Sequence, residues 1–224
     1  MSDAELRALE TRLRGRFRVV ETGVEIAEHQ LRLLHPASAE DLIDEAAFER
    51  DERLPYWAEL WPSSTVLAKF LVEEERPSAR AIELGSGIGL VAIAAALAGH
   101  DVLATDYYED ALAFTRANSF RVLGRELPTM LLDWRAVPRT LGRFELVLAS
   151  DVLYESRYAP LVAGVIDRLL APRGTALVAD PGRVAAGAFV DACRERGMGA
   201  QTEATRPYLA GQVRQTISIV AVRR

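Results

Sequence analysis

The sequence contains one cysteine, Cys193, among its 224 residues. An intrachain disulfide is therefore excluded, and a reducing compartment is favoured. The longest apolar stretch, IGLVAIAAALAG at 88–99, is shorter than the roughly 20 residues that a membrane-spanning helix needs. The N-terminal stretch MSDAELRALETRLRGRF carries too many charges for a secretory signal peptide. We therefore expect a cytoplasmic protein with no membrane partner.

Basic residues are outnumbered by acidic residues, and histidine is scarce. Lysine and arginine total 27 against 32 acidic residues, and the net charge of −5 disfavours general binding to nucleic acid. The three histidines, His29, His35 and His100, are isolated and lack the spacing of metal ligands. We expect a monomer that binds neither nucleic acid nor a metal ion.

Short apolar runs alternate with helical stretches from residue 80 onward. The runs AIELG, DVLATD, TMLLD, ELVLASD and TALVAD predict buried strands, with helices between or after them. This alternation predicts a mainly parallel sheet with helices on both faces. Two β-like runs flank Leu209-Ala210-Gly211 in the tail, with no helix between them, and predict a terminal antiparallel hairpin.

The N-terminal third has a different pattern. Residues 3–14 have apolar positions at helical spacing and predict a surface helix. Residues 17–34 carry β-branched runs around Thr22-Gly23, consistent with a hairpin. We expect an extension over residues 1–76, ending in a lid-like segment that completes the pocket of a core over residues 77–224.

The segment AIELGSGIGL places a glycine turn between a strand and a helix. Gly85 and Gly87 let the backbone turn tightly and approach a ligand. The third glycine is one place too early for a dinucleotide fingerprint, and no lysine follows as in a P-loop. Glu83 stands two places before the first glycine, and Asp106 ends the next predicted strand, where a carboxylate can accept hydrogen bonds from ribose hydroxyls.

Together, E-x-G-x-G-x-G, the aspartate after the second strand and the terminal hairpin resemble the class I S-adenosylmethionine-dependent methyltransferases, from about Pro55 to the C-terminus. Three further segments, LPYWAELWPSS, LDW at 132–134 and ASDVLY at 149–154, resemble methyltransferase family 16, the protein-lysine methyltransferase-like branch. Within it, PYWAELWPSS is most similar to the electron-transfer-flavoprotein lysine methyltransferase subgroup, although that subgroup has WPGG where this sequence has WPSS. The resemblance implies an α/β, Rossmann-like, seven-stranded sheet with six strands parallel and the last antiparallel.

The resemblance also implies which residues bind the methionine end of the cofactor. Glu83 would lie under the glycine loop, near the methionine amino group. Gly85, Ser86 and Gly87 would shape that loop. Trp61 would pack over the cofactor from the preceding segment.

At the adenosine end, Asp106 would hold the ribose and Tyr107 would flank the adenine. Asp133 would bond to the adenine and Trp134 would stack on it. From its position alone, Trp134 could equally belong to the core, and Tyr56 and Trp57 could face either the substrate or the core.

Near the transferable methyl group, the resemblance places Ser150 against the cofactor and Asp151 and Tyr154 as the Asp-x-x-Tyr signature. A capping turn at a strand end is the structural alternative for Asp151 and Tyr154. Asp151 would orient the incoming amine, although acceptance of its proton is left open.

The implied reaction is N-methylation of a lysine side chain in a protein, with S-adenosyl-L-methionine as cofactor. Lysine is almost fully protonated at neutral pH and must lose a proton before it attacks. Methylation of a small-molecule amine or pyridine-like nitrogen is one alternative, and a non-catalytic cofactor-binding module is another. A nicotinamide dehydrogenase is disfavoured by the glycine spacing and the hairpin tail.

Overall fold

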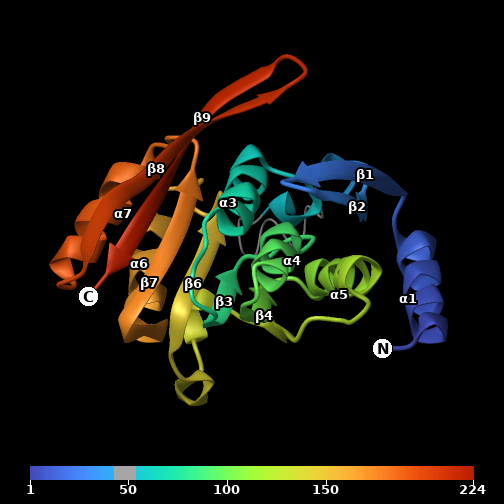
Figure 1. Ribbon diagram of the computed structural model, residues 1–224, viewed down its shortest axis with the longest axis horizontal. Helices are drawn as coiled ribbons and strands as arrows, with labels where there is room; N and C mark the ends of the chain where they lie inside the picture. Colours follow the sequence, from blue (N-terminus) through green and yellow to red (C-terminus); the bar gives the residue numbers. More distant parts are fainter. Residues whose placement is uncertain (43–53) are drawn as a thin grey trace.

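A seven-stranded sheet forms the centre of the chain in the computed structural model, which describes residues 1–42 and 54–224 (Figure 1). The strand order is β5-β4-β3-β6-β7-β9-β8. Neighbouring strands from β5 to β7 pair in parallel, whereas β9 is antiparallel to both β7 and β8. Six strands therefore run one way and the last runs the other, as predicted. The strands are β3 (Arg80–Leu84), β4 (Asp101–Asp106), β5 (Thr129–Leu131), β6 (Phe144–Ser150), β7 (Leu170–Asp180), β8 (Gly199–Ala210) and β9 (Val213–Arg223).

Helices cover both faces of this sheet, as the near-continuous apolar strands require. One face packs against α3 (Pro62–Glu73), α4 (Leu90–Leu97) and α5 (Glu109–Leu123). The other face packs against α6 (Tyr158–Leu169) and α7 (Ala185–Glu195). Two apolar cores result, one on each side of the sheet. None of the described helices is long and apolar enough to cross a membrane.

The N-terminal segment consists of α1 (Asp3–Arg16) and a two-stranded hairpin of β1 (Val19–Ile26) and β2 (His29–Pro36). The predicted hairpin exists, but the expected turn at Thr22-Gly23 is wrong. Gly23 lies within β1 and pairs with Arg32, while the chain reverses at Ala27 and Glu28, with Ala27 at φ 49°. Alternate burial continues past Gly23 to Val24 and Ile26, so packing extends the strand beyond the glycine.

The side chain of Asn118 on α5 joins this hairpin to the glycine loop. Its Oδ1 accepts a hydrogen bond from the Leu34 N–H at 2.7 Å. Its Nδ2 donates to the carbonyls of Leu34 and Ile88, each at 2.9 Å. Because Asn118 is fully buried, these backbone groups have no access to water as a substitute.

We expect Asn118→Ala to lower the free energy of unfolding by about 3 kcal/mol, since it leaves buried backbone groups unpaired. Urea denaturation followed by circular dichroism measures the change. Gln212→Ala, in the exposed turn between β8 and β9, is the control and should change stability by less than about 0.5 kcal/mol. A loss as small as that of the control would show that Asn118 does not tie the hairpin to the core.

Candidate active site

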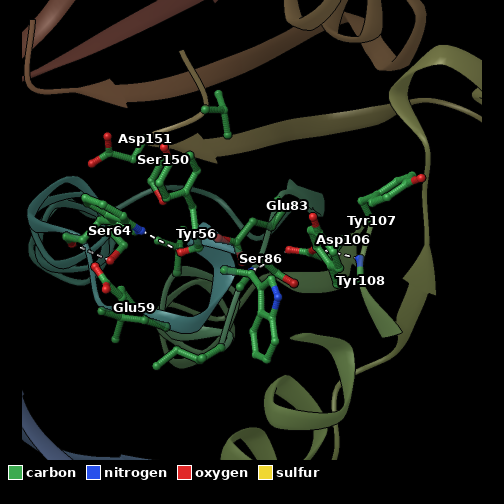
Figure 2. Close-up of a pocket in the computed structure, with 18 of the residues that line it drawn as sticks. Tyr56, Glu59, Ser64, Glu83, Ser86, Asp106, Tyr107, Tyr108, Ser150 and Asp151 are labelled. Carbon is green, nitrogen blue, oxygen red and sulfur yellow. Dashed lines mark hydrogen bonds between the residues drawn. The ribbon is translucent and has the colours of Figure 1, made fainter. Parts of the chain in front are cut away.

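One pocket gathers the predicted residues at the carboxyl ends of the parallel strands, the edge where open α/β sheets bind ligands (Figure 2). The space within and in front of it, open solvent included, is about 910 Å³. Every predicted site residue except Asp133 lines it: Trp61, Glu83, Gly85, Ser86, Gly87, Asp106, Tyr107, Trp134, Ser150, Asp151 and Tyr154. The structure therefore brings together residues from four strand ends and from the segment before α3.

Glycine is required at two positions of the loop between β3 and α4. Gly85 and Gly87 have φ of 73° and 53°, in the left-handed region that side chains disfavour. A Cβ on Gly87 would lie 3.0 Å from the Trp57 carbonyl oxygen. A Cβ on Gly85 would lie 3.4 Å from Val152 and 3.5 Å from the Trp134 ring. The missing side chains let the loop backbone form a wall of the pocket, as a closely bound ligand requires.

Asp106 at the end of β4 holds this loop in place. Its Oδ2 accepts a hydrogen bond from the Gly87 N–H at 2.9 Å, and its Oδ1 accepts one from the Tyr108 N–H at 3.0 Å. The residue is 5% exposed and lines the pocket. A carboxylate at this strand end is placed where it can accept hydrogen bonds from ribose hydroxyls, as the sequence predicts.

Glu83 ends deep in the pocket, under the glycine loop. It is 1% exposed, and its Oε2 has no hydrogen-bond partner among the described residues. Burial raises the pKa of this carboxyl well above its usual value, the Ala92 N–H opposes the rise, and the nearby Asp106 carboxylate adds to it. A buried acceptor without a donor suits a cationic amino group, so this observation fits the methionine end of S-adenosylmethionine.

We expect cofactor affinity to rise with pH because of Glu83. In the free protein this carboxyl keeps its proton to unusually high pH, while a bound ammonium group favours the ionised form. Cofactor binding should therefore release a proton from Glu83 at pH values between the usual and the raised pKa of this carboxyl. Above the raised pKa, Glu83 is already ionised in the free protein, so the cofactor affinity should stop rising with pH. Calorimetry in buffers of different ionisation enthalpy measures that proton.

Glu83→Gln is the reference protein for this experiment. Protons that the cofactor itself gains or loses on binding contribute equally in the original protein and in the variant, so the difference between the two reports on Glu83. The variant should bind more weakly and lack the proton release attributed to Glu83. Equal proton release by the two proteins would show that Glu83 does not ionise on binding.

Asp133 lies outside the pocket lining, immediately after the lining residue Leu132. Its carboxylate accepts hydrogen bonds from the Arg135 N–H at 2.9 Å and from the Arg135 guanidinium at 2.6 Å. The predicted bond from Asp133 to adenine is not supported by this placement and stays a prediction. Trp134 does line the pocket, and its ring lies beside Gly85, while its stacking on adenine stays a prediction.

Five aromatic side chains form a continuous row through the pocket, which we call the aromatic row. Successive ring centroids are 5.8, 5.0, 4.7 and 6.0 Å apart. The members, in spatial order, are Trp61, Tyr56, Tyr154, Tyr158 and Trp134. Tyr56, whose placement the sequence left open, thus faces the pocket. Trp57 lines the pocket and also packs against Phe114.

Asp151 follows β6 directly and is held in an unusual backbone conformation. Its φ is 57°, and its N–H donates to the Ala179 carbonyl at 3.0 Å. The side chain is buried, with Oδ1 bound by Arg183 and Oδ2 bound by no described residue. Asp151 thus combines a positive φ with a buried carboxylate that has one oxygen unpaired among the described residues, and its role toward a ligand stays a prediction.

Sequence reasoning missed two carboxylates and one arginine. Glu59 lines the pocket and is exposed to solvent, whereas Asp180 and Arg183 lie behind Asp151, outside the lining. Asp180 ends a predicted strand, in the run DPGR, and that position was the available signal. Glu59 lies in an irregular segment, where no periodicity indicates the direction of a side chain.

The strand order of the sheet, together with a pocket at the carboxyl ends of its strands, is the fold of the S-adenosylmethionine-dependent methyltransferases. Magnesium protoporphyrin IX methyltransferase from Synechocystis PCC 6803, solved with bound SAM, shares this fold with a TM-score of 0.60 at 18% identity, over 82% of this chain and 94% of that one. A family model described as lysine methyltransferase matches residues 47–191. The chain belongs to this lysine methyltransferase family.

Two curated relatives agree with this assignment. The electron transfer flavoprotein beta subunit lysine methyltransferase of Xenopus laevis is 36% identical over 58% of this chain and 53% of its own length. The protein N-lysine methyltransferase METTL21A of Danio rerio is 32% identical over 62% of this chain and 68% of its own. The chain spans about half the length of several of the relatives that it matches.

Proposed function

We propose that this protein transfers a methyl group from S-adenosylmethionine to the side-chain amine of a lysine in a protein. The observation that carries the proposal is the division of a single pocket. Glu83, the glycine loop and Asp106 form a cofactor cradle, while Asp151, Tyr56 and Tyr154 form a second, cation-accepting end. Membership of the lysine methyltransferase family supports the same reaction.

The cofactor, when bound, supplies a methyl group on a positively charged sulfur. A neutral amine would form the N–C bond as the S–C bond breaks, and the electron pair of the S–C bond would stay on sulfur. The protein has to position the amine in line with that bond, because alignment alone supplies a large share of the rate enhancement. Asp151 at the end of β6 would accept an N–H of the amine through Oδ2. Tyr154 would contact the lysine side chain through its ring, as aromatic faces do with cationic groups.

A protein substrate is favoured over a small metabolite by the far end of the pocket. Glu59 is exposed there and adds a carboxylate near the surface, where it would attract a basic segment. A metabolite site is usually more enclosed and apolar. The names of the relatives support a lysine in a protein as the acceptor.

Radiolabel transfer tests the proposal. The purified protein is incubated with methyl-labelled S-adenosylmethionine and a cell extract, and macromolecules are separated from small molecules. We expect label in a discrete protein band, lost with Asp151→Ala. Label confined to the small-molecule fraction would contradict the proposal and favour a metabolite methyltransferase.

Self-labelling is easily separated from substrate labelling in this experiment. The chain contains one lysine, Lys69 on α3. Lys69→Arg is therefore the matched control, because it removes the lysine that self-methylation would require. A band that survives in this variant belongs to another protein.

A further inference from the structure

Three charged residues meet behind the pocket, where β6 and β7 end. The Arg183 Nε donates to Asp151 Oδ1 at 2.6 Å, and a terminal nitrogen of the same guanidinium lies 2.5 Å from that oxygen. Asp180 Oδ1 accepts hydrogen bonds from the N–H groups of Gly182 and Arg183, both at 2.7 Å. Asp180 thereby fixes the turn that carries Arg183, and Arg183 in turn fixes Asp151.

The arginine reaches Asp151 without lining the pocket. Its guanidinium lies 5.5 Å from the centroid of the Trp61 ring and makes a cation–π contact with this lining residue. Both of its contacts with Asp151 fall on Oδ1, so Oδ2 is left as a buried acceptor without a partner among the described residues. Asp151 therefore presents one oxygen to the arginine and keeps the other for a ligand.

This arrangement matters for a reaction that consumes a neutral amine. A carboxylate without a counter-charge stabilises the ammonium form of lysine, which has no lone pair and cannot attack a methyl group. A cation beside the carboxylate cancels that effect and still leaves an oxygen to accept an N–H. The charges of Arg183 and Asp151 sum to zero, so their ion pair meets this requirement.

We propose that Arg183 neutralises Asp151, so that Oδ2 orients the substrate amine without holding it as an ammonium ion. This role rests on the proposed lysine methylation. The proton released by the amine leaves to solvent, and Arg183 acts as a positioning residue that contacts neither substrate nor cofactor. Asp151 then serves to orient the nucleophile, which the sequence left open.

The other charged and titratable groups around this end of the pocket do not replace Arg183. Burial raises the pKa of Asp180, the N–H groups of Arg183 and Gly182 oppose the rise, and the Asp151 carboxylate adds to it. Glu59 is exposed, so water screens its charge. Among residues 1–42 and 54–224, the remaining groups are Tyr56, Tyr154, Tyr158 and the ion pair of Arg157 with Glu155.

Binding of a lysine side-chain mimic tests this role. The probe is n-butylammonium chloride, titrated at neutral pH into protein saturated with S-adenosylhomocysteine, which fills the cofactor end. We expect Arg183→Gln to bind the probe about tenfold more tightly than the original protein, because the charge that opposed the cation is gone. Arg183→Lys keeps a cation and should restore affinity to within about threefold of the original.

Arg194→Gln is the matched control, since Arg194 lies on α7, is exposed and pairs with Asp191. Its affinity for the probe should equal that of the original protein. Damage to the pocket would weaken binding, so tighter binding by Arg183→Gln cannot arise from misfolding. Equal or weaker binding by Arg183→Gln overturns the role of Arg183, as does failure of both proteins to bind the probe.

The same titrations separate this role from the proposed function. Failure of the original protein to bind S-adenosylhomocysteine would overturn the proposed function, and the role of Arg183 with it. Binding of S-adenosylhomocysteine with unchanged probe affinity in Arg183→Gln would overturn the role of Arg183 alone.

Discussion

Replacement of Asp106 with alanine is expected to weaken S-adenosylmethionine binding about a hundredfold. The carboxylate accepts hydrogen bonds from the N–H groups of Gly87 and Tyr108 and lies at the strand end where ribose hydroxyls are expected to bind. Hydrogen bonds to a charged group contribute about 1.5–3 kcal/mol each, so the loss of the ribose contacts and of the loop anchor amounts to about 3 kcal/mol. Calorimetric titration with the cofactor measures the change directly.

Asp101→Ala is the matched control for this prediction. Asp101 is the first residue of the same strand, β4, and is exposed at the amino ends of the parallel strands, away from the pocket. Its cofactor affinity should stay within about twofold of the original. If Asp106→Ala bound the cofactor as well as Asp101→Ala did, the ribose role of Asp106 would be wrong.

Replacement of Asp151 with asparagine should reduce turnover by about a hundredfold to a thousandfold while cofactor affinity changes less than about threefold. Asp151 lines the pocket, and its Oδ2, which is unpaired among the described residues, would orient the amine of the proposed substrate. Asparagine is the suitable replacement because it tolerates the positive φ of 57° better than alanine does. Single-turnover methyl transfer to the labelled protein measures the rate.

The pH dependence of this variant separates two roles for Asp151. If Asp151 orients the amine, raising the pH should not recover the activity of Asp151→Asn. Recovery at high pH would instead indicate that Asp151 removes a proton. Asp191→Asn, an exposed site on α7, is the control and should keep full activity.

The elements around the cofactor cradle follow closely from the sequence. The run DVLATD coincides with β4, and the residues from Glu109 to Leu123 form α5, because apolar periodicity and burial agree there. Asp106 and the glycine loop occupy their expected places because the turn after a parallel strand leaves the backbone few alternatives.

Side-chain direction in irregular segments does not follow from the sequence in the same way. Asp133 lies outside the pocket lining with its carboxylate bound by the neighbouring Arg135, and no periodic pattern encodes that placement. Arg183 comes 32 residues after Asp151, and only the pairing of β6 with β7 brings the two together. The reversal at Ala27 shows the same limit, since packing along β1 prevails over the preference of glycine for turns.

Amino-acid analysis of the labelled protein tests lysine methylation most directly. The protein band that receives methyl label from S-adenosylmethionine is hydrolysed to amino acids, which are separated against methylated standards. The structure and the family predict that the label elutes as methylated lysine, and that Asp151→Asn gives almost none. Label in methylated arginine, histidine or carboxyl groups instead would contradict the assignment of a lysine amine as the acceptor.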